Sequence, residues 1–178
     1  MEHKDNTISK LLFHDCNDVR ELSDEELEML ICEIIDIEAV GFALDELYKR
    51  NPERAMMLAK QILENSGDEV KYINAEYIDV YLQATALNMI FSRDRQYIID
   101  FITKNIADLD CYLYTTILDE LSAEAKQTFG KNLDYTFIKT LLNRYDFYDK
   151  AEKEKADENY KWFLSSYSER IISENIQN

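Results

Sequence analysis

Histidine and cysteine, the side chains that most often act as nucleophiles, bases or metal ligands, are few in this chain. The chain contains His3, His14, Cys16, Cys32 and Cys111. His14 and Cys16 flank Asp15, but neighbouring residues of a helix point in different directions. No second histidine and no CxxC pair completes a site there. We therefore expect no catalytic residue, no metal ligand and no cofactor.

Other patterns of catalytic chemistry are also missing from the sequence. It has no HExxH, GxSxG or GK[ST] motif, and its three glycines are too few for a phosphate-binding loop. Asp134, Asp146 and Asp149 do not have the spacing of a calcium loop. The sequence therefore favours a binding protein, with an enzyme that uses an unfamiliar carboxylate pair as an alternative.

Carboxylates are abundant and unevenly distributed. The chain carries 36 acidic and 20 basic side chains, a net charge of -16. Residues 15–46 hold twelve acids and one base, whereas residues 47–63 hold four bases and one acid. This balance argues against binding a nucleic-acid backbone. It favours either a solvated face or a surface that attracts a basic protein over a long range.

Acidic and tyrosine side chains are the candidate residues for contacting a partner. Tyrosine suits a contact surface because its ring buries area and its hydroxyl forms a hydrogen bond. The alternative for most tyrosines is core packing with a satisfied hydroxyl. The predicted contact residues are Glu28, Glu33, Asp36, Asp45, Glu46, Tyr77, Asp79, Tyr81, Tyr112, Tyr114 and Asp119.

The elements that position these side chains are all predicted to be helices. Ser23 and Glu26 form a capping box, Asn51-Pro52 starts another helix, and Asp94 can cap a third. The helix that starts at Asn51-Pro52 should end near Gly67 in a left-handed turn. Further helices are predicted at about 37–49, 69–91, 110–121, 123–129, 133–147 and 150–175 from apolar residues at helical spacing.

A repeat organises these helices. Residues 44–59 align with residues 87–102 at an offset of 43, and each copy is a helix, a polar cap and a helix. We predict an all-α fold of about eight to nine helices, with HEAT-like antiparallel pairs in a short right-handed or irregular solenoid. An irregular bundle is the alternative.

The length suits a single domain over residues 1–178. Its expected parts are a weakly ordered start (1–14), acidic N-terminal helices (15–65), central helix pairs (66–122) and C-terminal helices (123–178). The start lacks the features of a signal peptide, and no run of apolar residues suits a membrane helix. Scattered cysteines fit reduced thiols, so we expect a cytoplasmic protein.

The segment LDELYKRNPERA at residues 44–55, followed by QATAL at 83–87, resembles a group of small acidic HEAT-like bacterial proteins. Several of these look like immunity proteins of contact-dependent growth inhibition and related polymorphic toxin systems. The resemblance implies a non-enzymatic cytosolic antidote that binds the C-terminal domain of a cognate toxin, often a nuclease.

An RNase, including the EndoU-like class, would be a natural target. An acidic surface would fill its basic cleft, in a 1:1 heterodimer that needs neither nucleic acid nor a membrane. Two other functions stay open: a helical-repeat adaptor for a cellular protein, and an inhibitor that mimics DNA.

Overall fold

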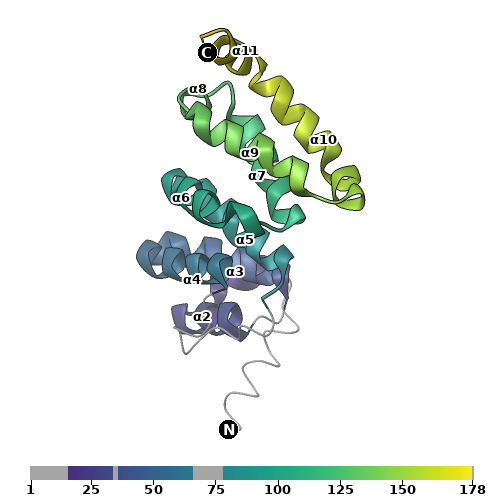
Figure 1. The fold of residues 1–178 in the computed structure, drawn as a ribbon. Helices are drawn as coiled ribbons and strands as arrows, with labels where there is room; N and C mark the ends of the chain where they lie inside the picture. The colour runs from purple at the N-terminus through teal and green to yellow at the C-terminus, as the bar shows by residue number, and fades with distance from the viewer. Residues whose placement is uncertain (1–15, 34–35, 66–77, 178) are drawn as a thin grey trace. The chain divides into compact units, whose positions relative to one another are not determined.

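The computed structural model describes residues 16–33, 36–65 and 78–177, and every regular element in these ranges is a helix. There are ten α-helices in this part of the chain, α2 to α11, besides the short 3-10 helices η1 (Cys16–Glu21) and η3 (Ile106–Asp108) (Figure 1). The predicted all-α fold of packed helices is confirmed. None of the helices in the described ranges is both long and apolar enough to cross a bilayer.

The chain forms two compact units, Met1–Arg93 and Asp94–Asn178, which we call unit 1 and unit 2. Each unit has a hydrophobic core of its own, built from residues at helical spacing. The single domain expected from the sequence stays a prediction.

One helix of unit 1, at residues 37–50, packs against all the other described elements of the unit. Unit 1 contains α2 (Asp24–Glu33), α3 (Ile37–Arg50), α4 (Pro52–Glu64) and α5 (Val80–Phe91). Helix α3 packs against η1, α2, α4 and α5, and α4 also packs against α5. The largest fully buried side chains of this core are Phe91, Leu27, Ile31, Leu44, Leu47, Leu58, Ile62, Leu63, Leu82 and Leu87. Each contributes on the order of 1.5–3 kcal/mol of hydrophobic stabilisation.

The predicted capping residues start their helices. The Glu26 N–H donates to Ser23 Oγ at 3.2 Å, and the Ser23 N–H donates to the Glu26 carboxylate at 2.9 Å, which is a capping box. Asn51 and Asp94 each accept from the N–H three residues further on, both at 3.2 Å. The two copies of the 43-residue repeat therefore share the same local cap.

Two helix ends in unit 1 differ from the prediction. The helix expected from residue 69 begins at Val80, because Asp79 is extended and accepts a hydrogen bond from the Leu82 N–H at 2.9 Å. Residues 66–77 lie outside the described ranges. Asn65 takes the left-handed conformation that ends α4, with φ of 48°, and Gly67 lies outside the described residues. Asparagine is one of the few residues that tolerate this conformation.

The longest helix of unit 2 makes the most extensive helix–helix contact of the unit. Unit 2 contains α6 (Arg95–Asn105), α7 (Cys111–Glu124), α8 (Thr128–Lys131), α9 (Tyr135–Phe147), α10 (Lys150–Ser166) and α11 (Ser168–Gln177). Helix α10 packs along α7, and α9 contacts α6, α10 and α11. Its fully buried core includes Tyr114, Ile117, Leu118, Ile138, Leu141 and Phe163.

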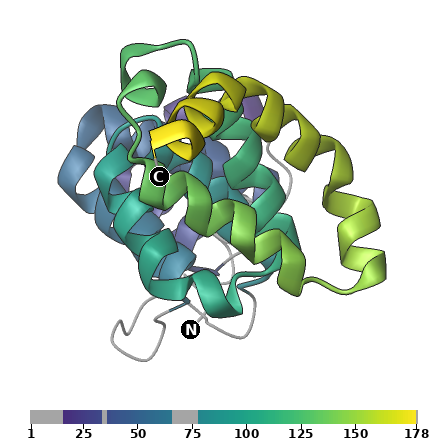
Figure 2. The ribbon, with the colours of Figure 1, turned by 45° about the horizontal axis from the view of Figure 1, so that its top comes forward.

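The prediction of a single helix at 150–175 is wrong, because the helical segment is interrupted at Tyr167 and forms two helices, α10 and α11. Figure 2 shows them as consecutive helices at the yellow end of the chain. The Tyr167 ring packs on Phe163 with the ring centroids 4.8 Å apart, and its buried hydroxyl donates to the Leu121 carbonyl at 2.9 Å. This anchor to α7 holds Tyr167 outside helical geometry. The helix predicted at 123–129 is also shorter, since residues 125–127 form a turn before α8.

Candidate functional site

Basic side chains of unit 1 fold back onto its acidic helices. Arg54 Nη2 lies 2.6 Å from Glu28 Oε2, which joins α4 to α2. Glu46 pairs with Lys49 at 2.8 Å and with Arg50 at 3.1 Å. The hydrogen bond from Lys49, with Arg50 adding to it, lowers the pKa of Glu46. Part of the acidic charge is therefore neutralised within the unit.

Asp45 in α3 pairs with Arg93 in the turn that follows α5. Arg93 Nη2 donates to Asp45 Oδ1 at 2.7 Å, and the Arg93 guanidinium lies 4.4 Å from the centroid of the Tyr48 ring. The Asp45 side chain is still 55% exposed. Asp45 is therefore a surface acid whose position is fixed by a cation.

Three further predicted contact residues hold the fold together. Asp36 and Asp79 are the N-caps of α3 and α5, and Asp119 joins α7 to α10. The hydrogen bonds run from the Ala39 N–H to Asp36 (2.9 Å), from the Leu82 N–H to Asp79 (2.9 Å) and from Asn159 Nδ2 to Asp119 (2.6 Å). Each of these carboxylates already accepts a hydrogen bond within the fold. They can therefore add negative charge to a surface, but they have less capacity to accept hydrogen bonds from a partner.

The predicted tyrosines separate into exposed and buried residues. Tyr81 is 54% exposed and Tyr112 is 45% exposed, whereas Tyr114 is fully buried. The Tyr114 hydroxyl donates to the Leu141 carbonyl at 3.0 Å. Residues two apart on a helix point to nearly opposite sides, so Tyr112 and Tyr114 cannot share a face. Tyr114 is a core residue, and we remove it from the contact set.

The remaining predicted residues are Glu33 and Tyr77. Glu33 is partly exposed at the end of α2. Tyr77 lies outside the described residues, as do His3 and His14.

A groove between α3 and α5 brings Asp45 together with residues that the sequence did not single out. Its volume is about 520 Å³, and its lining includes Ile37, Glu38, Phe42, Asp45, Asn88 and Met89. Gly41 lets the two helices approach closely, because a Cβ there would lie 3.1 Å from Thr85 Cγ2. The groove therefore combines apolar side chains with two acids, Glu38 and Asp45, and with Arg93, which pairs with Asp45.

Phe42 is the exposed aromatic residue of this groove, with 42% of its surface accessible. Glu38 is also exposed and makes no ion pair within the described part of the chain. Tyr81 lies one turn before Thr85 on the α5 face that lines the groove, so it extends the same surface. We call Ile37, Glu38, Phe42, Asp45, Tyr81 and Met89 the α3–α5 surface. Tyr112 and Asp119 belong to unit 2 and are not part of it.

One signal in the sequence points to Phe42. The buried stripe of α3 is formed by Val40, Leu44 and Leu47. Phe42 falls two residues after Val40, on the side of the helix away from this stripe. A large apolar residue off the core face of a helix marks a candidate contact.

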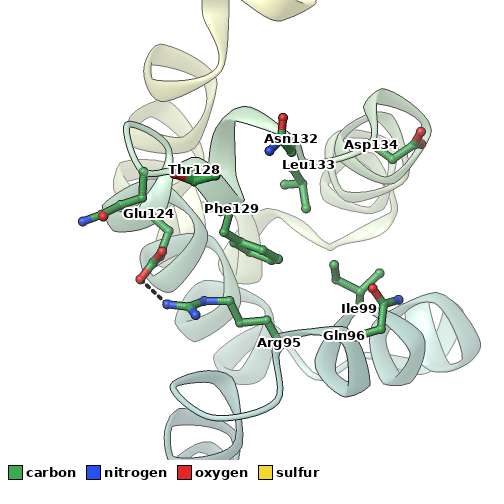
Figure 3. Close-up of a pocket in the computed structure, with 10 residues that line it drawn as sticks. Arg95, Gln96, Ile99, Glu124, Thr128, Phe129, Asn132, Leu133 and Asp134 are labelled. Atoms are coloured by element: carbon green, nitrogen blue, oxygen red, sulfur yellow. Dashed lines mark hydrogen bonds and ion pairs between the residues drawn. The ribbon is translucent and has the colours of Figure 1, made fainter.

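Unit 2 contains a larger pocket, of about 710 Å³ (Figure 3). Arg95 Nη2 pairs with Glu124 Oε1 at 2.8 Å, and its guanidinium lies 5.3 Å from the centroid of Phe129. Figure 3 shows Phe129 and Leu133 pointing toward Ile99 across the pocket. No histidine, cysteine or serine lines the pocket. The arrangement suits contact with a polar chain segment more than nucleophilic chemistry.

The described thiols are poor nucleophiles. Burial raises the pKa of Cys32 to about 11 and also raises the pKa of Cys111. Both thiols are therefore protonated at neutral pH. Across the described residues, no group of three or more histidines, cysteines and carboxylates is placed to hold a metal ion.

Comparison with known proteins gives no match: no family model, no curated protein and no solved structure is similar to this chain at a significant level. The surfaces of this chain and their chemistry are therefore the basis on which its function is inferred.

Proposed function

We propose that this protein is a non-enzymatic immunity protein that binds and neutralises a cognate toxin domain, a basic nuclease such as an RNase. The α3–α5 surface of unit 1 is the contact site in this proposal. The observation that carries it is an exposed aromatic side chain, Phe42, in a groove that Glu38 and Asp45 also line, in the more acidic unit.

The charge of unit 1 supports a basic partner. Unit 1 holds twenty acids and nine bases, whereas unit 2 holds sixteen acids and eleven bases. The exposed acids Glu21, Glu25, Glu38 and Glu53 make no ion pair within the described part of unit 1. Such an excess of like charge attracts a basic protein and speeds its association.

The shape of the groove supports a protein rather than a small molecule as the partner. Energetically important contacts cluster around large side chains near the centre of an interface, with a polar rim that excludes water. Phe42 between Glu38 and Asp45 has this arrangement, and Tyr81 adds a second aromatic contact. Helices also present these side chains in a preordered form, which reduces the entropy lost on binding.

A nuclease provides the complementary surface. Its cleft must carry lysine and arginine side chains to hold phosphates. Carboxylates on rigid helices can take the places of those phosphates, and Phe42 can fill an apolar gap beside them. The immunity protein then blocks the cleft without any chemistry of its own.

Co-expression tests the function. The chain is expressed together with the product of the gene immediately upstream of its own, and the growth of the host is measured. We expect the upstream product to stop growth alone and to lose this effect when the chain is present. An upstream product that is not toxic, or whose toxicity is unchanged, contradicts the proposal.

Variants locate the contact. Phe42→Ala and Glu38→Lys should reduce protection, and Phe147→Ala and Glu158→Lys are matched controls in unit 2. Phe147 is 79% exposed, so its removal leaves the core intact as the removal of Phe42 does. Equal protection by all four variants would exclude the α3–α5 surface. Glu38 is a better choice than Asp45 or Glu46, because lysine at either of those positions also breaks an ion pair inside unit 1.

The same experiments separate the other two functions. A stable partner that is not toxic would identify an adaptor. Displacement of the partner by duplex DNA, when that partner is a DNA-binding protein, would identify an inhibitor that mimics DNA.

A further inference from the structure

A cationic groove lies in unit 2, in contrast to the acidic character of the whole chain. It is formed by the end of α7, by α8 and by the junction of α10 and α11, and its volume is about 1070 Å³. Three bases, Lys126, Lys131 and Arg170, line it together with one acid, Glu169. We call it the α8–α11 groove. Figure 1 shows α8 and α11 near each other at the C-terminal end of unit 2.

Two close contacts fix the walls of this groove. A Cβ at Gly130 would lie 2.5 Å from the Ala125 Cα, so α8 sits directly on the end of α7. Arg170 Nη1 donates to the Lys131 carbonyl at 2.8 Å, which joins α11 to α8. The backbone of α8, which carries Lys131, is therefore fixed against α7 and α11.

The groove also presents an aromatic face. Trp162 lines it and is 47% exposed, and it is the single tryptophan of the chain. An indole ring offers a large flat surface on which a planar ring can stack. Ser165 and Ser166, on the same helix, add hydroxyl groups to the lining.

We propose that the α8–α11 groove binds a small phosphate-bearing ligand with a planar ring, of the mononucleotide class. Lys126, Lys131 and Arg170 meet the phosphates, and Trp162 stacks on the base. The volume exceeds the range of about 300–1,000 Å³ that is usual for small-ligand sites by a small margin, so a mononucleotide fits with room for water. This site is separate from the contact surface proposed for the toxin.

The charge of the chain decides between a mononucleotide and a nucleic-acid strand. Screening limits a small anion to nearby charges, and the charged side chains that line the groove are three bases and one acid. A strand would extend over surface that belongs to a chain with a net charge of -16 and would be repelled there. The small ligand is therefore the favoured occupant.

The fluorescence of Trp162 reports directly on the groove, because no other tryptophan contributes to it. The full chain is titrated with ADP, GDP, CDP and UDP, with adenosine and inorganic pyrophosphate as partial ligands, and calorimetry checks each result. We expect saturable binding of at least one diphosphate, weakened at least about tenfold without its phosphates. Absence of saturable binding for all four diphosphates would overturn the proposal.

Charge variants assign the binding to this groove. Lys126→Gln combined with Lys131→Gln should weaken diphosphate binding by about tenfold or more. Lys104→Gln combined with Lys139→Gln removes the same charge from exposed lysines elsewhere in unit 2 and should leave binding nearly unchanged. Equal weakening by the two double variants would show a nonspecific charge effect and overturn the site.

A single-stranded oligonucleotide provides the last comparison. If a twelve-nucleotide strand binds more tightly than every mononucleotide and the same lysine variants abolish it, the ligand is a strand and the proposal is wrong. Neither outcome bears on protection against a toxin, which is measured separately.

Discussion

Many of the aspartates in this chain act as N-caps of helices. The N-cap is an aspartate in six of the described helices, namely Asp36, Asp79, Asp94, Asp110, Asp134 and Asp149. Each accepts a backbone N–H that the helix leaves unpaired, and its charge complements the positive end of the helix dipole. Part of the acidic composition is therefore explained by the fold, without reference to a partner.

Replacement of one such cap tests this role. Asp79→Ala should lower the free energy of unfolding by about 0.5–2 kcal/mol, because the Leu82 N–H loses its acceptor. Asp79→Asn should restore most of the loss. The measurement is urea denaturation, with Glu158→Ala as an exposed control that should stay within about 0.5 kcal/mol of the wild type. A change in Asp79→Ala no larger than in the control would contradict the role.

Buried thiol and phenol groups with a raised pKa predict how the free energy of unfolding changes at alkaline pH. Burial raises the pKa of Cys32 from 9.0 to about 11, and the pKa of Tyr148 and of Tyr167 from 10.0 to about 12. The folded state therefore holds these protons more tightly than the unfolded state does. Their contribution to stability is complete below about pH 9 and is lost as the pH rises toward 11 and 12.

Urea denaturation at several pH values from 8 to 11 measures this effect. We expect the free energy of unfolding to fall steadily above pH 9. The variant Tyr148→Phe combined with Tyr167→Phe should show a smaller fall above pH 10, because it lacks two of the groups whose pKa is raised by burial. A free energy that stays constant between pH 9 and 11 would contradict the assignment.

At the scale of elements, helix starts were more predictable than helix breaks. Ser23, Asn51 and Asp94 are caps that precede regular apolar stripes, so the sequence shows both the cap and the helix. The N-cap at Asp79 is not recognisable from the sequence, because apolar residues continue at helical spacing on both sides of it. The helix break at Tyr167 is not visible in the sequence, because it depends on a tertiary contact with Leu121 that no local pattern shows.

The packing of α8 on α7 depends on one small residue. Gly130→Ala should lower the free energy of unfolding by about 1–3 kcal/mol, because the added methyl group would collide with the Glu124 carbonyl oxygen and the Ala125 Cα. Gly41→Ala is the matched control, since its methyl group would meet only Thr85 Cγ2, at 3.1 Å. Thermal and urea unfolding compare the two variants, and an equal cost would show that the contact at Gly130 is not special.

At the scale of the whole molecule, the sequence predicted an all-helical fold and an uneven charge, and the fold is confirmed. It did not predict which acids are neutralised, because the pairs Arg54–Glu28 and Arg93–Asp45 depend on how α4 and α5 pack against their neighbours. Of the predicted contact residues, Asp45 and Tyr81 fall on one surface. Phe42 and Glu38 complete it, and only the structure brings them together.

The most direct test of toxin binding by the α3–α5 surface is the binding kinetics of the purified chain with the purified toxin domain encoded upstream, at about 0.05 and 0.5 M salt. Long-range attraction to the acidic surface predicts that the association rate constant falls at least about tenfold at the higher salt. Phe42→Ala should raise the dissociation rate constant by about tenfold or more and change association little. No complex, or rate constants indifferent both to salt and to Phe42→Ala, would contradict the account.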